Sequence, residues 1–177
     1  ICGMKKKRIA ALLKHDINLY AYHLPLDVHH VLGNNAQLGK LLNIEDIRPL
    51  NVVSPEGIVM QGTINGGISG ADLKAKLNAR LNREPLHECP NSELIHTLAW
   101  CTGGGQGYIE IAAQQGIDAF ITGEVSEQTI HTSREMNIHF YAAGHHATER
   151  YGAKAVAEHL RSETALEVVF VDIPNPA

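Results

Sequence analysis

The stretch IHFYAAGHHATE, residues 138–149, joins an apolar run to a glycine and then to a polar segment with helical spacing. The apolar run is typical of a buried strand, and His145 and Glu149, four residues apart, would share one face of a helix that begins directly after it. The same order of apolar run, loop and helix recurs from residue 94 onward. We therefore predict an α/β fold whose largely parallel strands alternate with helices.

Apolar spacing and turn residues give the expected elements along the chain. Helices are expected at 5–14, 35–43, 71–81, 108–115, 126–136 and 146–162, and strands at 18–23, 52–53, 58–61, 94–101, 118–122, 138–143 and 166–171. Ser69 and Asp72 predict the start of the third helix. We divide the chain into residues 1–45, an inserted strand-helix region at 46–92 that is antiparallel, and residues 93–177.

A weak internal repeat links the two ends of the chain. INLYAYH at residues 17–23 resembles IHFYAAGH at 138–145, and each follows a helical segment and precedes polar residues. The two parts are therefore predicted to be copies of one α/β unit. The counterpart of the 118–122 strand would fall upstream of Ile1, so we expect the chain to begin inside a longer protein, with the N-terminal part of the first copy missing.

Composition excludes several classes of protein. A formal net charge of −4 makes nucleic acid and anionic membrane surfaces unlikely partners. No apolar run is long enough for a membrane helix, and the three widely spaced cysteines suit a reducing, cytoplasmic location. The basic cluster at residues 5–8 lacks accompanying aromatic residues and is typical of a solvated helix start.

Three side chains are candidate metal ligands. His145 and Glu149 are close enough on one helix to hold an ion between them, although an ordinary helix start with Glu149 paired to Arg150 would show the same spacing. Asp27 follows the apolar run of the first repeat, where open parallel sheets bind ligands, or it is a turn residue. His23 would orient a ligand or carry a proton, or it is an unremarkable residue at a strand end.

Two further motifs lie at predicted strand ends. Gly103, Gly104 and Gly105 precede a helix, and their amides would cradle an anion or simply allow a tight turn. His131, four residues after Glu127, is a candidate general acid or base, with a solvated helix face as the alternative. The adjacent pair His29-His30 is not expected to bind one ion, because neighbouring side chains point apart.

Several of these motifs together resemble a known family. HLPLD (23–27), GNN (33–35), TGGG (102–105), TGE (122–124) and GHHATE (144–149) are similar to the GTP cyclohydrolase I type 2 homologue family, also called the Nif-three-like dinuclear metal-centre family, and to its enterobacterial YbgI-like branch. The resemblance covers essentially the whole chain. It implies two duplicated, intertwined α/β halves, a pair of divalent metals and a ring-shaped homohexamer.

The resemblance also assigns metal ligands. Asp27 would bind one metal, His145 the other, and Glu149 would bridge both. The family takes two more ligands from an adjacent His-His pair in its N-terminal part, and His29-His30 does not match that place. The chain would thus supply three of five ligands for two ions of zinc, iron or manganese.

Two functions remain open at this point. The first is a dinuclear metal hydrolase that opens the ring of a purine nucleotide such as GTP, with His131 or His23 as proton shuttle and the 103–107 loop holding phosphate. The second is a ring-forming scaffold or binding protein whose metals are structural and which has no turnover.

Overall fold

The computed structural model describes residues 1–177 as eight α-helices, one 3₁₀ helix and one six-stranded sheet. The helices are α1 (Gly3–Lys14), α2 (Leu24–Asp27), α3 (Asn34–Leu41), α4 (Gly70–Leu81), η1 (Gln106–Tyr108), α5 (Ile109–Gln114), α6 (Glu127–Glu135), α7 (His145–Thr148) and α8 (Tyr151–Glu163). The strands are β1 (Glu45–Pro49), β2 (Met60–Ile68), β3 (Leu86–Glu88), β4 (Ile95–Cys101), β5 (Ala119–Thr122) and β6 (His139–Ala142).

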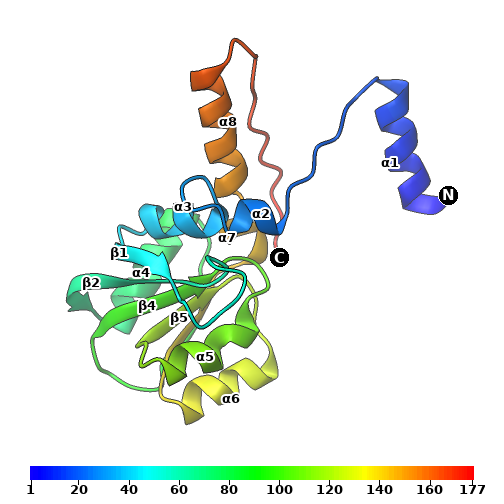
Figure 1. Ribbon diagram of the computed structural model, residues 1–177. Coiled ribbons are helices and arrows are strands. Elements are labelled where there is room, and N and C mark those ends of the chain that lie inside the picture. The colour runs from blue at the N-terminus through cyan, green and yellow to red at the C-terminus, as the bar shows by residue number, and fades with distance from the viewer.

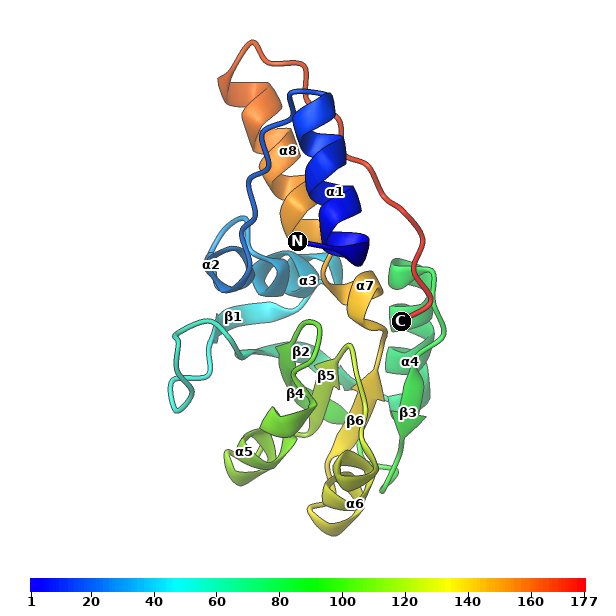
Figure 2. The same ribbon diagram turned by 90° about the vertical axis from the view of Figure 1, so that its right-hand side faces the viewer.

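The predicted α/β class is confirmed, and the sheet is mixed. Its strand order is β1-β2-β4-β5-β6-β3, with β4, β5 and β6 parallel and the other three pairings antiparallel. Antiparallel strands lie at both edges, β1 at one (Figure 1) and β3 at the other (Figure 2), and the parallel part is smaller than predicted because residues 18–23 and 166–171 form no strand. The three-part division of the chain stays a prediction.

Helices cover both faces of the sheet. Along β4 the side chains alternate between two apolar clusters, as a strand requires. Leu98 and Trp100 pack with residues of α3 and α4, whereas Ala99 and Cys101 pack with α5 and, through the partly buried Ile130, with α6. The carboxyl ends of the parallel strands remain open between these layers, beneath α2 and α7 (Figure 2).

The two longest predicted strands without a counterpart lie near the ends of the chain. Residues 18–23 and 166–171 have no strand partner, and most of their apolar side chains are exposed, with Leu19 at 71% and Val169 at 70%. An alternating pattern shows only that a segment suits a sheet, and a strand forms only where another strand accepts its backbone hydrogen bonds. Both segments extend from the body together with α1 and α8 (Figure 1).

Other boundaries also differ from the sequence prediction. Residues 52–53 lie in a turn, β2 extends well beyond the expected 58–61, and the helix expected at 146–162 is divided into α7 and α8. The short strands β1 and β3 were not predicted, because both are polar and show little apolar alternation.

Candidate metal centre

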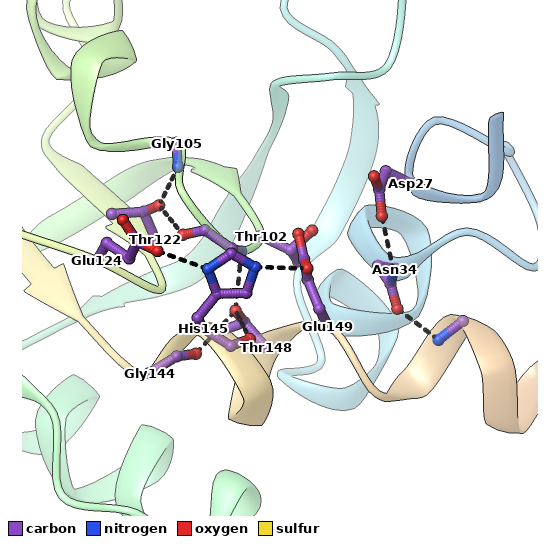
Figure 3. Close-up of polar contacts among 12 residues, drawn as sticks. Asp27, Asn34, Thr102, Gly105, Thr122, Glu124, Gly144, His145, Thr148 and Glu149 are labelled. Carbon is purple, nitrogen blue, oxygen red and sulfur yellow. Dashed lines mark hydrogen bonds and ion pairs between the residues drawn. The ribbon is translucent and has the colours of Figure 1, made fainter. Parts of the chain in front are cut away.

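The three parallel strands end side by side. In the register of the sheet, Cys101 is opposite Thr122, and Thr122 is opposite Ala142. The loops that follow therefore emerge at one edge of the sheet, which is where open α/β sheets bind ligands. The glycine-rich loop, the Gly123-Glu124 turn and the start of α7 meet there (Figure 3).

Backbone hydrogen bonds join these three loops. The amide of Gly123 donates to the carbonyl of Gly103 at 2.8 Å, and the amide of Gly144 donates to the carbonyl of Gly123 at 2.9 Å. The hydroxyl of Thr148 accepts from the amide of Gly103 at 3.0 Å, and that of Thr122 accepts from Gly105 at 3.0 Å. These hydrogen bonds satisfy buried amides and hold the three loops in fixed positions relative to one another.

The imidazole of His145 lies between two carboxylates. Its Nδ1 is 2.6 Å from Glu124 Oε1, and its Nε2 is 2.8 Å from Glu149 Oε2 (Figure 3). The hydrogen bond that His145 donates to Glu124 is the main reason that the pKa of His145 is raised. Burial raises the pKa of Glu149, although His145 opposes that shift. The short contact between His145 Nε2 and Glu149 Oε2 places two potential ligand atoms where one cation could bind both.

Glu124 also fixes which nitrogen of His145 faces the pocket. A carboxylate beside Nδ1 favours the tautomer that carries its proton there, which leaves the Nε2 lone pair directed toward Glu149. Metal-binding histidines commonly donate their other N–H to a carboxylate in this manner. The exposed Glu124 therefore completes the arrangement expected of a metal ligand.

Asp27 approaches from α2 and is buried, with 5% of its surface exposed. The amide nitrogen of Asn34 donates to Asp27 Oδ1 at 2.7 Å, and Asn34 Oδ1 accepts from the amide of Gly152 at 2.7 Å. Asn34 thus ties α2 and α3 to the start of α8. It orients Asp27 toward the side of the site occupied by Glu149 (Figure 3).

One pocket of about 270 Å³ contains all three predicted metal ligands. Its lining is His23, Leu24, Asp27, Ile58, Cys101, Thr102, Gly104, Tyr108, His145 and Glu149. Two carboxylates and an imidazole form a donor set suited to zinc, iron or manganese, so the residues fit a divalent ion. A larger pocket of about 590 Å³, beside His30 and Lys40, does not bring together such a set.

The glycine-rich loop is explained by close packing. A Cβ on Gly103, whose φ is +64°, would fall within 2.0 Å of Glu149 Oε1 and 3.0 Å of His145 Nε2. The amides of Gly103 and Gly105 already donate to threonine hydroxyls, and only Gly104 lines the pocket. The geometry thus favours the tight turn over an anion cradle.

The remaining predicted residues are separated. His23 lines the pocket, whereas His131 is exposed on α6 and does not, so the geometry gives His131 no support as a proton shuttle. His29 and His30 stack with centroids 5.0 Å apart outside the pocket, and His29 Nδ1 accepts from the amide of Leu32 at 3.0 Å. The stacking contradicts the expectation that the two side chains point apart, because the turn in which His29 Nδ1 accepts backbone N–H groups brings the rings together.

Several candidate functional residues were not predicted from the sequence. Glu124 and Asn34 act through hydrogen bonds between distant loops, and only their places in the TGE and GNN motifs could have identified them. A second group, His87, Cys89 and His139, has ligand atoms that all lie within 4.8 Å of one another and could hold a metal ion. The spacing of His87 and Cys89, two residues apart at the end of β3, was its only signal.

Comparison with known proteins decides the family. The family model described as Duf34/NIF3 (NGG1p interacting factor 3) matches residues 1–176. The chain belongs to the Duf34/NIF3 family. A relative from Haemophilus influenzae, named "GTP cyclohydrolase 1 type 2 homolog", is 58% identical over 178 residues, which is 100% of this chain and 70% of the relative. An Escherichia coli K12 relative of the same name is 53% identical over 179 residues, with the same shares covered.

Solved structures of Duf34/NIF3-like proteins share the fold. The structure titled "protein ybgI, unknown function" has a TM-score of 0.93 and 53% identity, covering 100% of this chain and 70% of that one. A Thermus thermophilus structure, TTHA1606, has a TM-score of 0.88 and 30% identity, covering 100% and 69%. The family resemblance predicted from the motifs is thus confirmed. None of the helices here has both the length and the apolar character needed to cross a membrane.

Proposed function

We propose that this Duf34/NIF3 chain contributes to a metal-dependent hydrolase in which Asp27, His145 and Glu149 hold divalent metal. The observation that carries the proposal is the placement of His145 between Glu124 and Glu149 in a pocket that Asp27 also lines. A carboxylate behind the histidine and two carboxylates in front of it are typical of a metal centre.

Each side chain would have its own role in such a site. Divalent metal bound there would lower the pKa of a water molecule and polarise a substrate oxygen. Glu124 holds the tautomer of His145, and Asn34 orients Asp27. His23 at the rim of the pocket is the candidate proton shuttle, since imidazole exchanges protons near neutral pH.

The substrate class is inferred from the relatives. Several carry the name "GTP cyclohydrolase 1 type 2 homolog", which suggests hydrolytic opening of the purine ring of GTP, in which one water adds at C8 to give a formamide and a second water releases that carbon as formate and leaves an amine. A phosphoester or an amide would also suit the same ligands, so substrate screening starts with GTP and extends to those classes. Phosphate binding by Gly103, Gly104 and Gly105 is not part of the proposal, because two of these amides are engaged.

A pair of metals, as the resemblance implies, requires ligands beyond these three. We infer that two ions of zinc, iron or manganese bind where a complete ligand set is present, and that Glu149 bridges them.

The alternative proposal is a homohexameric scaffold with structural metals and no turnover. It is favoured by the exposed apolar side chains of residues 18–23 and 166–171, which suit burial between subunits. Here metal would stabilise the fold without an exchangeable water position.

Elemental analysis of the purified chain separates these proposals. Wild-type protein should contain zinc, iron or manganese, and Asp27→Ala and Glu149→Ala should each lower the metal content per chain, while a Glu127→Ala control on the exposed start of α6 should leave it unchanged. Formate release from GTP, lost in the same two variants, would support the hydrolase. If the alanine variants lose metal but a protein that contains all five ligands shows no turnover, the scaffold proposal is supported. Metal content unaffected by either alanine would contradict both proposals.

A further inference from the structure

A second cluster of ligand-type side chains lies at the opposite edge of the sheet from β1, where β3 pairs with β6. The register places His87 opposite Tyr141 and Glu88 opposite Phe140, and continuing it places Cys89 opposite His139. Since alternate residues of a strand share a face, His87, Cys89, His139 and Tyr141 project from the same side. None of them lines the pocket that holds Asp27 and Glu149.

The hydrogen bonds of this cluster determine where the lone pairs point. Asn91 donates its amide N–H to the carbonyl of Asn137 at 3.0 Å and accepts from the amide of Glu93 at 3.0 Å, so its Oδ1 must be the acceptor near His139. His139 Nε2, at 3.1 Å, therefore donates to Asn91 Oδ1. By elimination, His139 Nδ1 carries the free lone pair, and it faces His87 Nε2 at 3.2 Å.

This spacing matches a tetrahedral metal site. Two nitrogens bound to one zinc ion at ~2.0–2.1 Å lie about 3.3 Å apart, close to the separation of the two imidazole nitrogens here. The Sγ of Cys89 lies within 4.8 Å of both nitrogens, and its thiol donates to the carbonyl of Asn91 at 3.0 Å.

Packing holds the two imidazoles in place before any ion binds. His87 stacks on Tyr141 with ring centroids 4.2 Å apart, and Tyr141 donates to the carbonyl of Gly70. A Cβ on Gly70 would lie 2.9 Å from His87 Cε1 and 3.0 Å from His139 Cε1, so only glycine leaves the rings this room. His139 is 2% exposed, and Asn91 contacts its far nitrogen as an orienting group does.

We propose that His87 Nε2, Cys89 Sγ and His139 Nδ1 form a mononuclear zinc site at the β3–β6 edge, separate from the Asp27–His145–Glu149 centre. Two imidazoles and one thiolate favour zinc over magnesium or calcium. Binding displaces the Cys89 thiol proton to solvent and requires the His87 tautomer that carries its proton on Nδ1, which frees the Nε2 lone pair; because Cys89 is exposed, water completes the tetrahedron.

Cobalt gives a direct test, because a cobalt–thiolate bond has a charge-transfer band that carboxylate and imidazole ligands do not produce. The 177-residue chain is stripped with chelator and titrated with Co²⁺ in an Asp27→Ala/Glu149→Ala background, which removes the ligands of the other centre. We expect one equivalent of Co²⁺ to produce the band. Cys89→Ser should abolish it, while Cys101→Ser and Cys2→Ser should keep it.

Two further variants separate coordination from folding. His87→Gln leaves the buried His139 intact and should remove tight Co²⁺ binding with the circular dichroism spectrum unchanged. Asn91→Ala should weaken Zn²⁺ binding about 10- to 100-fold, since Asn91 orients a ligand and is not one itself. A chain that shows no band at saturating Co²⁺, or an equal band after Cys89→Ser, would overturn the site whatever happens at the other centre.

Discussion

At the scale of single residues, one hydrogen bond determines whether His145 can be a ligand. Glu124 is exposed and contributes little to packing, so its effect should be on metal rather than on folding. We expect Glu124→Ala to weaken metal binding about 10- to 100-fold because Nδ1 would lose the partner that fixes its tautomer. Competition with a chromophoric chelator measures the affinity, with Glu127→Ala as the control. Equal affinities in wild type and Glu124→Ala would refute the assigned tautomer.

The three cysteines should differ in reactivity. Burial, assisted by Glu149 and Asp27, raises the pKa of Cys101 to about 12, whereas Cys2 and Cys89 are exposed. In chelator-treated protein at pH 8, we expect iodoacetamide to label Cys2 and Cys89 and to spare Cys101 until urea unfolds the chain, because only the thiolate reacts. Peptide mass spectrometry reads out each site. Native labelling of Cys101 as fast as Cys89 would contradict its burial.

The same raised pKa has a consequence for stability. Above pH 9 the Cys101 thiol ionises in the unfolded chain while it stays protonated in the folded one. The unfolded state then binds fewer protons, so this residue's contribution to stability falls as pH rises from 9 toward 12. A Cys101→Ala variant should show a flatter alkaline stability profile in urea titrations.

At the scale of elements, the close approach of the glycine-rich loop to α7 leads to a sharp prediction. Gly103→Ala would place a methyl group against the carboxylate of Glu149 and strain a backbone with φ of +64°, at a cost of roughly 1–2 kcal/mol. Glu149 is the end of a flexible side chain and should swing away, so metal is lost while the fold survives. Gly107→Ala, in the same loop with nothing within 4 Å of the added carbon, is the matched control.

Thermal unfolding and elemental analysis together test the prediction for Gly103→Ala. Metal loss in Gly103→Ala with a small drop in melting temperature would agree with the geometry. Retention of wild-type metal content would show that Glu149 does not bind it from this position.

Elements differ in how far the sequence determined them. The helix at 71–81 was predictable because Ser69 caps it through Asp72 and its leucines share a buried face. His145 and Glu149 were predictable as a pair because their spacing is local. Asn34, in contrast, acts across 118 residues of sequence on Gly152, and β3 has only three residues. Neither feature leaves a periodic pattern in one sequence.

At the scale of the whole molecule, the predicted strands at 18–23 and 166–171 failed for a related reason. Their composition suits a sheet, yet neither finds a strand partner within this chain. The C-terminal segment is nevertheless held at a few points, where Asp172 bonds His146 Nε2 at 2.8 Å and Arg150 at 3.0 Å. The sheet core could be predicted because its contacts are among consecutive strands, whereas these segments depend on longer-range partners.

The exposed apolar surface of these segments predicts self-association. Leu19, Tyr20 and Tyr22 are 71–79% exposed, and α1 has no buried residue. Burying such side chains between subunits contributes about 25 cal/mol per Å², so oligomers should form at micromolar concentration, with a hexamer as the predicted state. Light scattering after size exclusion measures the mass. Leu19→Glu with Tyr20→Glu should shift it toward the monomer, while Val52→Glu, in an exposed turn, should not. A wild-type chain that stays monomeric at high concentration would rule out assembly through these segments, and with it the ring that the scaffold alternative requires.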